Sequence, residues 1–437
     1  MSIFVPNARL MINRLISFLN ASPVNFLAVE EISRQLDAAG FKRYDMASPN
    51  PCFAPGEGFY AIKNGSAIFA VRMGTAPVAE TGFKLICAHC DSPTFRIKPA
   101  SAMMSEGGIM RLNTEVYGGP ILSTWFDRPL SIAGRVILRS EDPLHPKSKT
   151  VMIERPILTI PNLAIHFNRQ VNDGVKLNRQ KDMLPLMDVS SLVNEELGKD
   201  RLILKLLSRE CGINEEDILD FDLYLYDTTP ACTIGLNGEF IQSGRLDDLS
   251  MAYAGLEAML AAKPSAATQV LAIFDNEETG SGTKQGAHSP VLRNLLKRIC
   301  GGSEAFYRAM EQSFMVSADN AHAFHPNYCD KYDPTNHPVL GGGPAIKINA
   351  AQKYATDADS AAVFKEICRI AGVPCQSFVN HSEVAGGSTL GNILTAQMPL
   401  RGVDMGNPIW AMHSCRETGS SADHVYCVKA FTTFYNL

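Results

Sequence analysis

The sequence predicts an α/β fold in which a mostly parallel β-sheet is sandwiched by helices and a β-rich segment is inserted into the chain. Short apolar runs such as 270–274 have the length and composition of buried strands. They alternate with helical segments such as 250–262, and this alternation is typical of parallel sheets covered on both faces. At 437 residues the chain exceeds one compact domain, which favours two.

The composition describes a globular protein and argues against several classes of partner. Hydrophobic residues make up 46% of the chain and charged residues 19%, as in a protein with a large core. A net charge of -5 argues against a nucleic-acid partner. No Lys/Arg run and no apolar run near the roughly 20 residues that cross a bilayer is present, so no membrane association is expected. Eleven cysteines without a CxxC pair are typical of reduced thiols and indicate a cytoplasmic protein.

The N-terminal part of the chain begins with helices and continues with strands. Helices are expected over 8–20 and 28–40, and the second ends at a glycine. Strands are expected over 60–63, 66–72 and 83–88. The last of these strands runs directly into the first group of polar residues of interest.

That group contains His89 and Asp91. Side chains alternate along an extended segment, so these two share a side while Cys90 points away. An aspartate beside a histidine can hold the imidazole or tune a metal that it binds. A lone histidine beside a strand is more often structural, and Pro93, which ends the strand, leaves the two roles equally open.

The chain changes character between the two parts of the first domain. Residues 96–238 alternate strand-like segments with turns and are interpreted as an inserted β-rich domain. The flanking parts, 1–95 and 239–437, form the domain that carries the polar strand ends. Within the insertion, His166 lies in an apolar run, and a core histidine bonded to the backbone is the favoured interpretation from the residues alone.

Two groups of acids follow the insertion. Asp275, Glu277 and Glu278 stand at the end of an apolar strand, where carboxylates that lose water and repel one another need a cation. A solvated acidic turn is the equally open alternative. Asp247 and Asp248 precede a helix and could cap it, but two consecutive aspartates exceed what capping requires.

Strands and helices continue to alternate toward the C-terminus. Helices are expected over 288–300, 302–312 and 357–371, and strands over 314–318 and 344–348. This part of the chain completes the predicted α/β sandwich.

Candidate metal ligands stand at strand ends or in the loops just beyond them: His89, Asp247, Glu278, Asp319 and His413. Open α/β sheets place their sites at the carboxyl ends of strands, so these residues can converge. Two histidines and three carboxylates suit zinc, with manganese or cobalt as alternatives. One catalytic zinc takes three protein ligands, whereas two metals that share a bridging carboxylate would use all five residues. The remaining acid, Glu277, would carry protons.

Several short motifs together resemble those of the M18 metallopeptidase family, the aspartyl aminopeptidases and their relatives. They occur in the order of the family and extend over essentially the whole chain. The matching stretches are 89–93, 117–119, 124–128, 161–166, 245–247, 275–278, 317–322, 325–328, 346–347, 352–355 and 411–414.

The resemblance implies a role for each candidate ligand. His89 and Asp319 would hold one metal, Glu278 and His413 the other, and Asp247 would bridge the two. Glu277 would be the general base, and Asp91 the acid that orients His89.

The resemblance also implies a substrate pocket and an assembly. The substrate-binding residues would be His166, His322, Lys347, Tyr354, Gly386 and Gly387. Lys347 would meet an acidic side chain, and His166 would reach the active site of a neighbouring subunit, in place of the core role favoured above. The insertion would be a dimerisation domain in a tetrahedral homododecamer.

The leading functional prediction is a cytoplasmic two-metal aminopeptidase that removes an N-terminal Asp or Glu from peptides with a free N-terminus. An aminopeptidase with a neutral preference is one alternative. A co-catalytic deacylase or carboxypeptidase is another, because similar metal pairs serve both chemistries. A non-catalytic scaffold or cargo assembly is the alternative outside enzymes.

Overall fold

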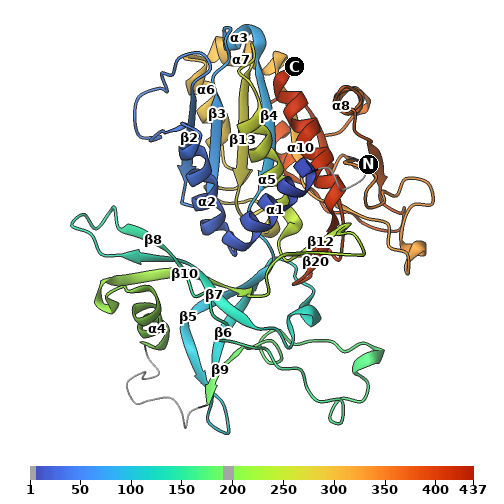
Figure 1. Cartoon of the computed structure of the whole chain (residues 1–437). Helices are drawn as coiled ribbons and strands as arrows, with labels where there is room; N and C mark the ends of the chain where they lie inside the picture. Colours follow the sequence, from blue (N-terminus) through green and yellow to red (C-terminus); the bar gives the residue numbers. More distant parts are fainter. Residues whose placement is uncertain (1–5, 190–200) are drawn as a thin grey trace. The chain divides into compact units, whose positions relative to one another are not determined.

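A computed structural model describes residues 6–189 and 201–437, and these residues form two compact units (Figure 1). The first unit comprises the described residues up to Asp91, together with 231–412 and 417–437. The second comprises the described residues of 92–230 and the short segment 413–416. The two compact units are divided after residues 91 and 230. The domain boundaries predicted after residues 95 and 238 stay a prediction.

The first unit is built on a nine-stranded sheet in the order β1-β2-β3-β13-β4-β14-β18-β16-β17. The central strands β13, β4, β14 and β18 run parallel to one another, and the three antiparallel pairings are β2–β3, β3–β13 and β18–β16. The strands are β1 Lys42–Arg43, β2 Gly58–Lys63, β3 Ala67–Arg72, β4 Phe83–His89, β13 Thr268–Phe274, β14 Phe314–Ala318, β16 Ala345–Ile348, β17 Gln376–Val379 and β18 Arg401–Gly406.

Helices cover both faces of this sheet, which confirms the predicted α/β class. One face packs against α1 Pro6–Ala21, α2 Asn25–Ala38, α5 Leu246–Ala261, α8 Ala358–Ala371 and α10 Ser421–Asn436. The other packs against α6 Val291–Ile299, α7 Ser303–Gln312 and α9 Leu390–Gln397, with the short α3 Val78–Thr81 at its margin. Figure 1 shows α1, α5 and α10 in front of the strands.

Strand β13 shows why the sequence contains uninterrupted apolar runs. Leu271 and Ile273 enter the core beneath α5, whereas Val270, Ala272 and Phe274 enter the core on the opposite face. A strand buried on both faces cannot alternate apolar with polar residues, so its stretch from Val270 to Phe274 is apolar throughout. The acidic residues follow at its carboxyl end.

A smaller five-stranded sheet completes the first unit, in the order β11-β12-β20-β19-β15. Its strands are β11 Cys232–Ile234, β12 Phe240–Ser243, β15 Ala321–His322, β19 Pro408–Trp410 and β20 Glu417–Ser420. This sheet joins segments far apart in the chain, and the sequence patterns did not predict it.

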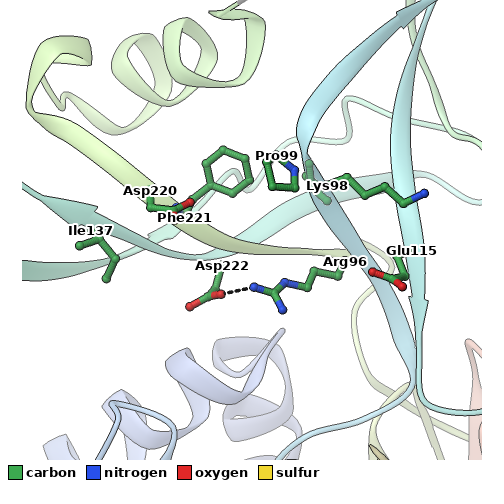
Figure 2. A pocket seen from close by; sticks show the side chains of 9 residues that line it. Arg96, Lys98, Pro99, Glu115, Ile137, Asp220, Phe221 and Asp222 are labelled. Carbon is green, nitrogen blue, oxygen red and sulfur yellow. Dashed lines mark hydrogen bonds and ion pairs between the residues drawn. The ribbon is translucent and has the colours of Figure 1, made fainter.

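The second unit is a six-stranded antiparallel sheet in the order β8-β7-β10-β5-β6-β9, as expected for a β-rich insertion. Its elements are β5 Thr94–Met104, β6 Ile109–Tyr117, β7 Leu130–Leu138, β8 Lys147–Met152, β9 Leu186–Val189, α4 Leu202–Cys211 and β10 Ile218–Asp227. One sheet face and α4 share an apolar core. Elsewhere on the sheet, Arg96 and Asp222 form an ion pair in a hollow of about 330 Å³ (Figure 2).

Among the described residues, no helix has both the length and the apolar character that crossing a bilayer requires.

Candidate metal centre

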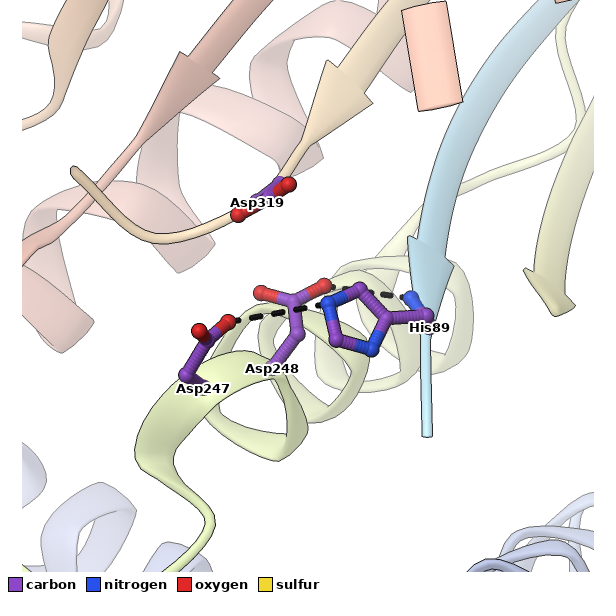
Figure 3. Close-up of side chains that lie close together, drawn as sticks. All are labelled: His89, Asp247, Asp248 and Asp319. Atoms are coloured by element: carbon purple, nitrogen blue, oxygen red, sulfur yellow. Dashed lines mark hydrogen bonds and ion pairs between the residues drawn. The ribbon is translucent and has the colours of Figure 1, made fainter. Parts of the chain in front are cut away.

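His89 is the last residue of β4 and is almost fully buried. Its Nδ1 lies 3.1 Å from the main-chain oxygen of Asp91 and 3.3 Å from the Asp91 carboxylate. Its Nε2 lies 3.6 Å from Asp247 Oδ1, and its backbone N–H donates to Asp248 Oδ2 at 3.1 Å (Figure 3). Burial lowers the pKa of His89, but the charges of Asp248, Asp247 and Asp91 outweigh burial and raise that pKa well above its usual range.

Asp247 and Asp248 lie at the start of α5. Both have non-helical backbone angles and mark a kink between Leu246 and the rest of the helix. The N–H of Asp247 donates to Glu417 Oε2 at 3.0 Å. Both carboxylates are buried beside His89, so they face the candidate metal centre.

Asp319 follows β14 directly and completes a cluster. One ligand atom each from His89, Asp247, Asp248 and Asp319 lies within 4.8 Å of the others (Figure 3). Within the described residues, Asp248 Oδ1 has no hydrogen-bond partner. Burial, and then Asp319 and Asp247, raise the pKa of Asp248, although His89 opposes them. Three buried carboxylates around one imidazole are costly without a counter-charge, so this donor set fits a divalent cation.

Glu277 and Glu278 lie in a short 3₁₀ turn, Glu277–Thr279, directly after β13. Their backbone N–H groups donate to Oδ1 and Oδ2 of Asp91, each at 3.1 Å. Asp91 thus connects this turn to the imidazole of His89. One oxygen of each glutamate lies within 4.8 Å of the other and of His89, so proximity alone does not separate the ligand from the base.

The protonation of the two glutamates reflects their surroundings. Burial raises the pKa of Glu277 to about 8, with a further rise from Asp319 and Asp91. Burial, and then the charge of Asp247, also raise the pKa of Glu278 well above its usual range. Carboxyl groups that hold protons near neutral pH become strong cation ligands when they lose them.

The turn rests on a buried polar network around Asp275. Asn25 Nδ2 donates to Asp275 Oδ1 at 2.9 Å, and Gln285 Nε2 donates to Asn276 Oδ1 at 2.8 Å. Asn276 has a left-handed φ of 62°, which this network holds in place. Asp275 therefore supports the turn, and it is absent from the clusters of described residues that could hold a metal ion.

The predicted substrate residues of the first unit lie on β16, on β15 and in loops beside them. Lys347 is buried on β16, with its Nζ 3.2 Å from Asp319 Oδ1 and 5.7 Å from the centre of the Tyr354 ring. Burial lowers the pKa of Lys347, but the charges of Asp319, Tyr354 and other nearby acids outweigh burial. The pKa of Lys347 therefore lies above its usual value. Lys353 Nζ donates to Gly386 O at 2.5 Å, next to Gly387.

His322 borders a mostly apolar cavity of about 330 Å³. Its ring centre lies 5.8 Å from that of Phe378 on β17. Phe378 is the register partner of Lys347, so the cavity adjoins the strand that carries the buried lysine. None of the described residues that line it is acidic.

Two predicted site residues, His413 and His166, belong to the second unit. His413 Nδ1 lies 3.1 Å from Gly119 O, and its role as a metal ligand stays a prediction. His166 is exposed, as are Ile165 at 52% and Phe167 at 81%. The core-histidine interpretation of His166 is therefore wrong, because the apolar run around it is a surface segment of this chain.

Sequence reasoning missed two members of the centre. Asp248 was left out of the ligand set, although it belongs to the cluster with Asp319. Glu417, which accepts a hydrogen bond from Asp247, was also missed. The doubled aspartate was a signal for the first, whereas no local pattern marks the second.

Comparisons with known proteins find similarity along nearly the whole chain. The sequence profile described as aminopeptidase I zinc metalloprotease (M18) matches residues 18–435. A probable M18 family aminopeptidase 2 of Clostridium acetobutylicum is 50% identical over 429 residues, which are 97% of this chain and 98% of the relative. A chain in the cryo-EM structure of the Ape4 and Nbr1 complex is 35% identical with a TM-score of 0.94, over 98% of this chain and 86% of that chain. The mApe1 dodecamer of S. cerevisiae is 25% identical with a TM-score of 0.84, over 98% of this chain and 97% of that one.

Proposed function

The chain belongs to the M18 family of zinc metalloproteases, and from that premise we propose that it is a two-metal aminopeptidase that removes N-terminal Asp or Glu from peptides. Aminopeptidase chemistry is the activity for which the relatives are named. The proposal of a metal-dependent active site rests on one observation, the buried cluster of His89, Asp247, Asp248 and Asp319 beside Glu277 and Glu278.

The proposed ligand sets use these residues together with His413. His89 and Asp319 would hold one ion, Glu278 and His413 the other, and Asp247 would bridge them. Asp248 would support the set, because it accepts the backbone N–H of His89. A bound pair of divalent ions polarises a carbonyl and lowers the pKa of water. Zinc is the proposed metal, with manganese or cobalt as alternatives.

Glu277 is proposed to move the proton. It takes a proton from the attacking water and gives it to the leaving amine. Its raised pKa of about 8 belongs to the protein without metal, and a nearby cation lowers that pKa because positive charge favours the carboxylate. Asp91 keeps Glu277 aligned through the backbone N–H at 3.1 Å.

Lys347 is proposed to select acidic residues. An ammonium group has three donors, so the lysine can pair with Asp319 and still donate to a substrate carboxylate. Tyr354 and His322 would form the walls of this pocket, and Gly386 and Gly387 would let the substrate approach the backbone. Lys347 already pairs with Asp319. If that ion pair satisfies the lysine, the enzyme would instead prefer peptides with a neutral N-terminal residue.

A panel of aminoacyl chromogenic substrates, assayed with zinc, manganese and cobalt, tests the proposal. The expected result is a kcat/KM for Asp and Glu substrates well above that for Ala and Leu. Higher values for the neutral residues would refute the acidic preference but leave the aminopeptidase activity standing. Turnover of acetylated peptides equal to that of free-amine peptides would contradict the aminopeptidase itself.

We propose further that the second unit dimerises and that the dimers form a dodecamer in the cytoplasm. The exposed Leu163, Ile165 and Phe167 around His166 support this, because apolar side chains of this size favour a covered surface. His166 would then act in a neighbouring subunit. Sedimentation of the purified protein checks the assembly, and a stable monomer at micromolar concentration would contradict it.

A further inference from the structure

Asp404 lies in the middle of β18 and is fully buried, yet no role has been assigned to it. Its strand is the neighbour of β16, with Ile346 opposite Met405 and the pair antiparallel. Lys347 and Asp404 are the next residues along these two strands. The negative charge of Asp404 accordingly favours the charged form of the buried lysine.

One carboxylate oxygen of Asp404 holds the segment that carries Tyr354. Oδ2 accepts the backbone N–H of Ala355 at 2.6 Å. The backbone N–H of Asp404 donates to Thr356 Oγ1 at 2.8 Å, which makes a second link to the same segment. Since Ala355 follows Tyr354 directly, these bonds hold the backbone that carries the Tyr354 ring, whose centre lies 5.7 Å from Lys347 Nζ.

The other carboxylate oxygen holds the loop that carries Gly386 and Gly387. Oδ1 accepts the hydroxyl proton of Thr389 at 2.5 Å, and Thr389 is the residue at the start of α9. A Cβ at Gly391 would lie 2.2 Å from Asp404 Oδ2, so the helix start can approach the carboxylate only with glycine there.

Two irregular segments therefore meet on one buried side chain. Both segments are loops at the residues that Asp404 binds. Residues 349–357 connect β16 to α8, and residues 380–389 connect β17 to α9. Lys353 Nζ, which donates to Gly386 O, is one direct link between them. A polar contact between the side chains of Tyr354 and Asn380 is another. A charged acceptor shared by two loops fixes the position of one relative to the other, because both bonds must be satisfied together.

We propose that Asp404 is a positioning residue that sets the selectivity for the N-terminal residue, by fixing Tyr354 and the 386–389 loop around Lys347. This inference rests on the proposed function, because it concerns the pocket that receives the side chain of the released residue. Asp404 touches no reacting atom; it acts through the two loops. Its loss should therefore change selectivity more than turnover.

The test uses the full-length, metal-loaded protein and the ratio of kcat/KM for Glu- and Leu-substrates. Asp404→Asn keeps the shape of the side chain but can accept only one of the two bonds. Thr389→Val removes one bond while Asp404 stays, which gives a second variant if the first does not fold. Each variant loses one charge-assisted hydrogen bond, so each should lower the ratio by about 10- to 100-fold, chiefly through KM for Glu.

Thr389→Ser keeps the hydroxyl and should restore the ratio to within about twofold of the wild type. Thr395→Val is the matched control on the same helix, since Thr395 Oγ1 donates only to backbone oxygens of α9. An unchanged ratio in both Asp404→Asn and Thr389→Val would overturn the inference. So would an equal fall of kcat for both substrates, which a merely structural role predicts.

The wild-type ratio separates this inference from the proposed function. A wild type without acidic preference would refute the proposed specificity, and the variants would then be compared with whichever residue the wild type prefers. An altered preference supports the positioning role in either case, and an unaltered one contradicts it.

Discussion

Asp91→Asn is the perturbation whose effect can be worked out most completely from the structure. The Asp91 carboxylate accepts the N–H groups of Glu277 and Glu278, each at 3.1 Å, and lies 3.3 Å from His89 Nδ1. Asparagine has the same shape but only one acceptor oxygen. Its NH₂ group would face a backbone N–H to which it cannot bond.

The magnitude follows from that lost bond. A hydrogen bond to a charged group contributes about 1.5–3 kcal/mol, and about 2 kcal/mol corresponds to about a 30-fold change in an equilibrium or a rate. Asp91 orients both a proposed ligand, His89, and the proposed base, Glu277. We therefore expect Asp91→Asn to lower both the zinc affinity and kcat. Removing a partner of a metal-bound histidine costs about 10–100-fold in metal affinity, which agrees with this range.

The assay is zinc affinity by chelator competition at fixed pH, together with kcat on a Glu-peptide at saturating zinc. Asp423→Asn is the matched control, because Asp423 is a buried carboxylate that accepts the N–H groups of Gly341 and Gly343, each at 2.8 Å. That variant should lose thermal stability but keep its zinc affinity. If Asp91→Asn bound zinc and turned over like the wild type, or if the control lost as much zinc, the assigned role of Asp91 would be refuted.

The remaining predictions concern the base, the lysine, the metal and pH. Glu277→Gln should keep metal but lower kcat by about 10²–10⁴-fold, and wild-type turnover would remove it as the base. Lys347→Leu should lower kcat/KM for Glu-substrates by about 100-fold while changing Leu-substrates little; an unchanged preference would exclude the lysine contact. Chelation of the metal should lower the melting temperature by several degrees, reversibly on zinc addition, because the ion binds the folded state; equal melting curves would contradict a bound ion. Zinc affinity should rise as the pH rises above the ordinary range of a glutamate, because burial and the charge of Asp247 raise the pKa of the proposed ligand Glu278 well above its usual value and its proton must leave before the metal binds. Calorimetry in buffers of different ionisation enthalpy should show proton release, and its absence would contradict the sign.

The strand–helix alternation and the strand ends could be predicted from the sequence because both are local. Strand β13 is apolar from Val270 to Phe274 since both its faces are buried, and the acids follow at once. The same reasoning placed His89 at the end of β4, which lies in register beside β13. Parallel neighbours end at one edge, so sequence alone indicated convergence there.

What could not be predicted depends on contacts between distant segments. That Asp248 lies beside His89 and Asp319 could not be seen in the sequence, because the three residues come from separate segments. The pairing of Lys347 with Asp319 joins β16 to the loop after β14, and no spacing in the chain encodes it. The return of 413–416 to the second unit is equally non-local. An apolar run such as that around His166 does not tell whether it is covered by its own chain or by another.

A zinc titration of chelator-treated protein, with release of N-terminal Glu from a peptide plotted against zinc bound per chain, tests the two-metal mechanism most directly. Two-metal catalysis predicts no turnover without metal and full activity only as the second zinc per chain is bound. Full activity at one zinc per chain, or turnover that persists after complete removal of metal, would contradict it.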